Sequence, residues 1–303
     1  MKRQLATAAI LLASGAYTLP AHAQTAASAP RSFAGVNDMV IACPPPAARS
    51  AEQLAAQFET RPRNLDEMSA NAKRFMDPAN PIGAGFREKR DAQFRTDWAF
   101  LCRYREANAA LKDSGVRPRV VFMGDSITEG WVEARPDFFS GHGFAGRGIS
   151  GQSSSQMIAR FYADVVALRP QAVHIMTGTN DIGGATGPIT EEEYVYNVRA
   201  MIDVAKANGI GVVLAAIPPM SRLMPRPEFN VRPVVLALNR RLKAIADETG
   251  AVFVDYYAPL ADGEGAFDPR FANDGVHPTR AGYVVMERLA EQAIGKAIPP
   301  TKP

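Results

Sequence analysis

The chain has 303 residues, of which 47% are hydrophobic and 21% are charged, so it is long and apolar enough to bury one sizeable core and is neither disordered nor fibrous. Its formal net charge is +3, and removal of Lys2 and Arg3 with the first 23 residues lowers it to +1. A balance so close to neutral argues against a nucleic-acid partner, and we expect none.

Residues 1–23 have the pattern of a secretory signal peptide. A basic start precedes a mostly apolar stretch at residues 6–19, and residues 21–23 form a small-x-small cleavage site. The alternative is a membrane anchor, but the apolar stretch is short and interrupted by polar residues. We therefore expect cleavage before Gln24 and export to the periplasm or medium. No later segment has the roughly 18 uninterrupted apolar residues that a membrane span needs.

Two cysteines, Cys43 and Cys102, follow the predicted cleavage site. An oxidising compartment lets such a pair persist as a disulfide, whereas two unrelated buried thiols are the alternative. We predict a bond that ties the mature N-terminus to a helix preceding the main domain.

The segment 24–117 is predicted to be an N-terminal extension. Residues 24–50 are rich in Ala, Ser and Pro and indicate a tether, while residues 51–112 have a helical pattern that is interrupted at Pro62 and at residues 78–85. A continuing helix would place five residues on one core-facing stripe: Phe94, Trp98, Leu101, Cys102 and Arg105.

Apolar runs and helical segments alternate after Pro118. The predicted strands are residues 119–123, 172–176, 211–217 and 251–255, and the predicted helices include residues 190–208, 233–250 and 279–294. Thr190 and Glu193 form a capping box, and Pro233 and Gly250 mark the ends of the second helix. This alternation is typical of a parallel sheet covered on both faces, so we predict an α/β domain over residues 118–297.

Four short polar motifs lie in this domain, several of them where a predicted strand ends. They are Gly-Asp-Ser-Ile-Thr at 124–128, Gly-Ile-Ser-Gly at 148–151, Gly-Thr-Asn-Asp at 178–181 and Asp-Gly-Val-His-Pro at 274–278. Open parallel sheets bind ligands outside the carboxyl ends of their strands. The motifs therefore predict one shared site at that edge.

Together the motifs contain the groups that acyl transfer needs. Ser126 is a candidate nucleophile, and His277 is the strongest candidate base because Asp274, three residues earlier, can orient its ring and stabilise the imidazolium. The oxyanion of a tetrahedral intermediate needs donors, which the backbone N–H groups of Ser126 and Gly151 and the side-chain amide of Asn180 can supply.

In order and spelling, the four motifs resemble the blocks of the SGNH, or GDSL-type, hydrolases, over roughly residues 120–294. The likeness is strongest to the branch that includes platelet-activating-factor acetylhydrolase-like and carbohydrate-esterase-like enzymes, although Ile127 replaces the eponymous Leu. The resemblance implies a three-layer α/β/α flavodoxin-like domain with a five-stranded parallel sheet. It also implies hydrolysis of a short acyl ester of a small molecule or carbohydrate, through an acyl-enzyme and without metal or cofactor.

Two other functions stay open at this point: an O-acyltransferase that acts on a sugar hydroxyl, and a non-catalytic glycan- or lipid-binding module on the same fold. Residues 218–233 either shape the binding site or form a surface excursion. The sequence does not determine the oligomeric state.

Several other polar and aromatic residues are expected to be structural. These are His142, His174, Trp131, Phe144 and Asp181, the last by satisfying its own loop backbone. Arg147 is left open between a substrate contact and a surface ion pair.

Overall fold

By residue contacts the chain divides into two units, residues 1–42 and residues 43–303. The computed structural model describes residues 43, 70, 73–74, 77–223, 226 and 228–298, all in the second unit. The predicted signal peptide at 1–23 and, apart from Cys43, the predicted tether at 24–50 lie outside the described residues.

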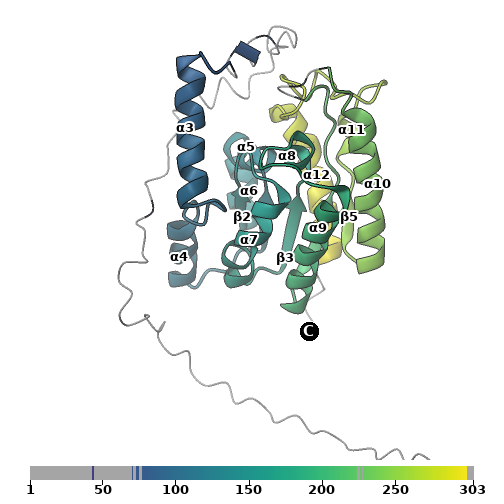
Figure 1. Ribbon diagram of the computed structural model, residues 1–303. Helices are drawn as coiled ribbons and strands as arrows, with labels where there is room; N and C mark the ends of the chain where they lie inside the picture. Colours follow the sequence, from purple (N-terminus) through teal and green to yellow (C-terminus); the bar gives the residue numbers. More distant parts are fainter. Residues whose placement is uncertain are drawn as a thin grey trace, which may run out of the picture. The chain divides into compact units, whose positions relative to one another are not determined.

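Five parallel strands form one sheet in the order β2-β1-β3-β4-β5, which is the flavodoxin-like order. Figure 1 labels β2, β3 and β5 of this sheet. The strands are β1 (Val120–Gly124), β2 (Phe144–Gly148), β3 (Ala172–Met176), β4 (Gly211–Ala215) and β5 (Val252–Val254). Four of them coincide with the predicted apolar runs. The predicted fold class is therefore confirmed.

Strand β2 was not among the apolar runs, because its sequence is Phe-Ala-Gly-Arg-Gly. Its glycines are explained by helix α5 (Ser126–Ala134), which packs against the strand. A Cβ atom on Gly146 would lie 2.2 Å from a methyl of Val132, and one on Gly148 would lie 2.2 Å from the backbone nitrogen of Glu129. Close helix packing thus requires small residues in a strand that the sequence pattern alone does not reveal.

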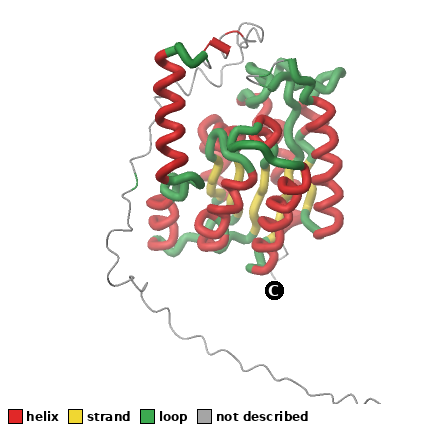
Figure 2. The backbone as a smooth tube through the Cα atoms, viewed as in Figure 1, coloured by secondary structure: helices red, strands yellow, loops and turns green. Residues whose placement is uncertain are grey.

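Helices cover both faces of the sheet, as the strands lying between helices in Figure 2 show. One face carries α7 (Ser154–Asp164), α9 (Glu191–Ala207) and α10 (Arg232–Thr249), and the other carries α5, α6 (Pro136–His142) and α12 (Arg280–Ala297). Alternate residues of β1 enter the two cores: Val121 and Met123 face the first group, and Val120 and Phe122 the second. This is the expected three-layer arrangement.

The predicted helix ends are also found. Thr190 caps α9 with the reciprocal bonds to Glu193 of a capping box, which satisfies two otherwise unpaired N–H groups. Helix α10 has Pro233 in its first turn and is followed by the C-cap Gly250, whose φ of 68° suits a residue without a Cβ. The shorter helices are α4 (Arg105–Asp113), α8 (Thr179–Gly183), α11 (Tyr257–Leu260) and the 3₁₀ turn η2 (Val166–Leu168).

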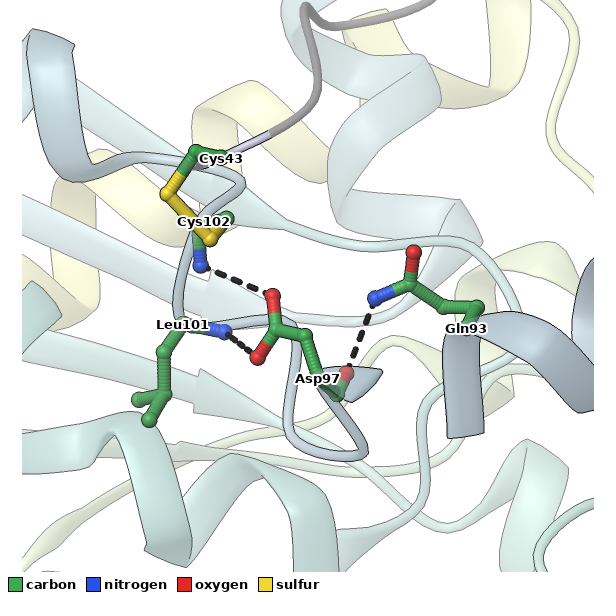
Figure 3. Close-up of a disulfide and its surroundings, with 5 residues drawn as sticks. All are labelled: Cys43, Gln93, Asp97, Leu101 and Cys102. Atoms are coloured by element: carbon green, nitrogen blue, oxygen red, sulfur yellow. Dashed lines mark hydrogen bonds between the residues drawn. A yellow bond between two sulfur atoms is a disulfide. The ribbon is translucent and has the colours of Figure 1, made fainter. Parts of the chain in front are cut away.

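The predicted helical stripe before the sheet is wrong. Helix α3 (Pro81–Thr96) starts inside the predicted interruption at 78–85, capped by Asn80, and ends at Thr96. The Asp97 carboxylate then accepts the N–H groups of Leu101 (2.7 Å) and Cys102 (2.9 Å), which folds the chain into turns (Figure 3). Because the helix stops there, Trp98 and Leu101 are 42% and 44% exposed instead of facing a core.

The predicted disulfide joins Cys43 to Cys102, with their Cα atoms 5.3 Å apart (Figure 3). Cys102 lies in the turns between α3 and α4 and not in a helix. In the described part of the chain, no helix combines the length and apolar character that crossing a membrane requires.

Candidate active site

Ser126 is the first residue of α5, directly after β1. Asp125 caps this helix by accepting the Ile127 N–H at 2.9 Å. Gly124 is required by space, because a Cβ there would lie 2.0 Å from the hydroxyl of Thr128. The Gly-Asp-Ser motif is thus a tight strand-to-helix turn that places the serine hydroxyl at the carboxyl edge of the sheet.

The loop before α12 brings an imidazole to this hydroxyl. His277 Nε2 lies 2.9 Å from Ser126 Oγ, and His277 Nδ1 lies 2.7 Å from Asp274 Oδ2. The other oxygen of Asp274 accepts the backbone N–H groups of Val276 (2.9 Å) and His277 (2.7 Å). These bonds hold the carboxylate in a fixed orientation, so that Nδ1 donates to it and Nε2 is free to accept the serine proton.

The acid and the imidazole shift each other's pKa. Burial by itself would raise the pKa of Asp274, but its hydrogen bonds and charge attraction to His277 lower it to about 2. Burial would lower the pKa of His277, but the hydrogen bond and charge of Asp274, with a smaller effect of Asp125, raise it. The His277 side chain is 34% exposed, so solvent reaches the pair.

Asn180 lies in α8, directly after β3, the strand beside β1. Connections leave β1 and β3 toward opposite sides of the sheet, which creates a crevice between their ends. The side-chain amide of Asn180 donates to the carbonyl of Gln152 (3.1 Å) and to Asp125 Oδ2 (3.3 Å). The structure therefore brings the first, third and fourth motifs together at one edge.

Gly151 lies in the loop that follows β2. Its φ is +81°, a conformation that residues with a Cβ rarely adopt, while a Cβ there would meet open space. The glycine is thus required by its backbone conformation. Its neighbour Gln152 accepts the Asn180 amide, which links the second motif to the third.

The remaining predicted residues lie away from this chain of bonds. His174 is buried in β3 and contacts the Tyr256 hydroxyl at 2.9 Å, and burial lowers its pKa to about 3. His142 ends α6, where Nδ1 lies 2.8 Å from the Phe138 carbonyl. Trp131 packs in an aromatic cluster that also includes Phe144 and Phe138, as expected.

Two predictions for neighbouring polar residues need correction. The Asp181 carboxylate does not bond only to the backbone of its own loop. It also accepts hydrogen bonds from the hydroxyl (2.6 Å) and the N–H (3.1 Å) of Ser154 at the start of α7. Arg147 is buried away from solvent and is not paired with a surface acid. It is 5% exposed, donates to Asn108 Oδ1 at 2.8 Å and lies 4.8 Å from the Tyr104 ring centroid.

Sequence reasoning missed the polar groups beneath the site. Arg160 is fully buried, and it donates to Gln152 Oε1 (2.5 Å), Asp164 Oδ2 (2.8 Å) and the Gly124 carbonyl (3.1 Å). It thereby connects the turn before Ser126 with the loop of Gly151. The only signal in the sequence was the four-residue spacing of Arg160 and Asp164 on one helix, which is common on solvated surfaces. Within the described residues, no cluster of three or more His, Cys, Asp or Glu side chains could hold a metal ion.

A parallel α/β sheet with a serine, histidine and aspartate in one hydrogen-bonded chain is the arrangement of a serine hydrolase. The profile of the GDSL-like lipase/acylhydrolase family matches residues 122–285, so the chain belongs to that family and is a serine esterase.

Two solved structures and an acetylxylan esterase are similar to it. A structure from Bacteroides fragilis, assigned as an acylhydrolase, is 44% identical with a TM-score of 0.64, covering 67% of this chain and all of its own. A GDSL-like lipase from Bacteroides thetaiotaomicron is also 44% identical, with a TM-score of 0.63 and coverage of 66% and 100%. An acetylxylan esterase of Geobacillus stearothermophilus is 28% identical over 215 residues, which are 60% of this chain and 95% of that enzyme.

Proposed function

We propose that the protein hydrolyses a short-chain acyl ester with Ser126 as nucleophile, His277 as general base and Asp274 as the group that orients the histidine. The supporting observation is the continuous chain of contacts from Ser126 Oγ to His277 Nε2 (2.9 Å) and from His277 Nδ1 to Asp274 (2.7 Å).

In the first half-reaction, Ser126 Oγ attacks the ester carbonyl carbon as its proton moves to His277 Nε2. The carbonyl electron pair moves to oxygen, and this oxyanion accepts hydrogen bonds from the N–H groups of Ser126 and Gly151 and from the Asn180 amide. The pair then re-forms the carbonyl, the carbon–alkoxy bond breaks, and His277 gives its proton to the departing alcohol. The acyl group is left on Ser126.

In the second half-reaction, water replaces the alcohol. His277 Nε2 takes a proton from water as the water oxygen attacks the acyl carbon, and the same oxyanion site holds the intermediate. Collapse breaks the bond to Ser126 Oγ, which recovers the proton from His277. Asp274 stays ionised throughout, because its pKa of about 2 is far below neutral pH.

The test is the Ser126→Ala variant, assayed with p-nitrophenyl acetate and labelled with a fluorophosphonate. Ser140→Ala is the matched control, because Ser140 is an exposed serine on α6. We expect Ser126→Ala to lose turnover and labelling while the control keeps both. Full esterase activity in Ser126→Ala would overturn the proposal, and absence of labelling and turnover in the wild type would favour a non-catalytic binding module.

For the substrate we propose an acetylated carbohydrate, a choice supported by the similarity to an acetylxylan esterase. A chain-length series of p-nitrophenyl esters beside acetylated xylo-oligosaccharides and short-chain phospholipids tests it. Because the site is open to solvent, a sugar hydroxyl can reach the acyl group as well as water. Product analysis with a sugar acceptor present separates hydrolysis from O-acyl transfer.

We further propose that the protein is exported and that a signal peptide is removed before Gln24. Support comes from the pattern of residues 1–23 and from the disulfide, since disulfides persist in oxidising compartments. N-terminal sequencing of the exported protein tests this: a retained Met1 would refute cleavage.

A further inference from the structure

The loop from Ile149 to Gln152, which follows β2, carries Gly151, yet it has no regular structure of its own. In a serine hydrolase a donor stabilises the oxyanion only if it is held in place before the reaction begins. Something outside the loop must therefore fix its backbone. The described contacts of the loop identify what does so.

Gly124, Glu129, Arg160 and Asn180 of the α/β domain hold part of the loop. Two further contacts come from residues 97–108, which we call the bracing segment. The Tyr104 hydroxyl donates to the carbonyl of Gly148, the last residue of β2 before the loop. At the other end, the Gln152 side chain donates to the Ala99 carbonyl at 3.1 Å. Shortly beyond, in the first turn of α7, Gln156 donates to the Trp98 carbonyl at 2.6 Å. The bracing segment thus holds the loop on both sides of Gly151.

An ion pair connects the bracing segment to the middle of the loop. Arg103 Nη2 donates to Glu129 Oε1 at 2.9 Å, and Glu129 Oε2 accepts the Ser150 N–H at 2.9 Å and also the Ser150 hydroxyl. Ser150 directly precedes Gly151. The Ser150 N–H, one residue before the proposed donor Gly151, is therefore linked to Arg103 through the carboxylate of Glu129.

The bracing segment is itself fixed. The Asp97 carboxylate closes its first turns, and the disulfide anchors Cys102 in its middle (Figure 3). Asn108, its last residue, donates to Asp164 Oδ1 at 2.6 Å. Burial, followed by the negative charge of Glu129, raises the pKa of Tyr104 to about 12, so its hydroxyl remains a donor at every working pH. The family profile begins only at residue 122, so this segment lies outside the matched region.

We propose that the disulfide-anchored bracing segment is a positioning element that holds the Gly151 loop in its oxyanion-binding conformation, with Tyr104 and Arg103 as its positioning residues. The inference rests on the proposed function, in which Gly151 donates to the oxyanion. It assigns the N-terminal extension a part in transition-state stabilisation, although none of the described residues of the extension contacts Ser126 or His277.

Tyr104→Phe is the sharpest test, because it removes only the hydroxyl and keeps the ring that packs against Arg147. The matched control is Tyr196→Phe, which removes the hydroxyl of an exposed tyrosine on α9 that bonds to Glu192. Each variant is assayed for kcat and KM with p-nitrophenyl acetate, for inhibition by phenylboronic acid, which forms a tetrahedral adduct on the serine, and for Tm.

We expect kcat of Tyr104→Phe to fall about tenfold, less than the hundredfold or more that loss of a whole oxyanion donor costs. Phenylboronic acid should bind more weakly by a similar factor, while KM and Tm match the control. Arg103→Met, at a side chain that is 32% exposed, should behave in the same way and serves as the second variant if Tyr104→Phe does not fold.

If Tyr104→Phe and Arg103→Met match Tyr196→Phe in kcat and in boronate affinity, the inference is overturned. A change confined to Tm or KM overturns it too, because that would be a purely structural or ground-state effect. Ser126→Ala, assayed in parallel, distinguishes failure of the proposed function from failure of the bracing role. An active Ser126→Ala removes the proposed function itself, whereas an inactive one with unaffected Tyr104→Phe removes only the bracing role.

Discussion

His277 Nε2 lies 2.9 Å from Ser126 Oγ although 151 positions separate the two residues in the chain. Ser126 is held by the start of α5, and His277 by the loop that precedes α12. Tyr283 of α12 also donates to the Ile127 carbonyl at 2.9 Å, which ties the two helices together. The contact is therefore built into the packing of two helices on the same face of the sheet.

Replacement of Asp274 with Asn should lower kcat by about a thousandfold to ten-thousandfold, because the histidine loses the acceptor that fixes its tautomer and stabilises its charged form. The fold should be retained, because Asn can still accept the backbone N–H groups of Val276 and His277. Steady-state kinetics with p-nitrophenyl acetate measures the change. A variant within tenfold of wild type would contradict the assigned role.

The pH profile gives a second readout of the same pair. The base must be neutral, so activity should disappear as pH falls through the pKa of His277, which Asp274 raises above the ordinary 6.5. In Asp274→Asn the burial of the imidazole is no longer opposed by that charge, so the acid limb of the kcat/KM profile should move to lower pH. A limb that stays in place, or moves upward, would be inconsistent with this coupling.

Asn180→Ala should lower kcat by about a hundredfold or more with little change in KM, since the amide is expected to contact the substrate only when the carbonyl oxygen becomes an oxyanion. Asn197→Ala is a suitable control, because Asn197 also donates through its amide, but to Ser154 (3.0 Å) and Ser155 (3.1 Å) at the start of α7. Equal kinetic effects of the two substitutions would remove Asn180 from the oxyanion site.

Replacing both Cys43 and Cys102 with Ser should lower the free energy of unfolding by about 4 kcal/mol, the loop-closure contribution expected for cysteines 59 residues apart. Urea denaturation of the wild type and the variant measures the difference. Thiol counting in the unreduced, unfolded wild type provides an independent check. Two titratable thiols there would show that the bond does not form.

The segment 218–233 should influence substrate preference. Its Phe229 is 39% exposed and lines a hollow of about 450 Å³ together with Tyr194, Leu238 and Ile182. Ile182 is two residues along the chain from Asn180, so the hollow begins near the proposed oxyanion site. We expect Phe229→Ala to change the ratio of kcat/KM for butyrate and acetate esters by about tenfold with little loss of Tm. Leu236→Ala, at an equally exposed apolar residue on α10, is the control. An unchanged ratio across the ester series would argue that the segment is only a surface excursion.

The sequence by itself determined the α/β class, four of the five strands and the identities of the candidate site residues. Each of these depends on a local signal: an apolar run such as residues 172–176, a capping pair such as Thr190 and Glu193, or a short polar motif at the end of a strand. Local signals are readable because the backbone conformation they favour depends on neighbouring residues.

The tertiary structure alone decided which groups meet. The glycines of β2 are explained only by the approach of α5, and the end of α3 depends on the Asp97 carboxylate turning the chain back. The contacts of Tyr104 with Gly148 and of Arg160 with Gln152 join segments whose sequences give no sign of one another. Such contacts depend on how helices and loops pack in three dimensions, and a pattern read along a single chain does not contain that information.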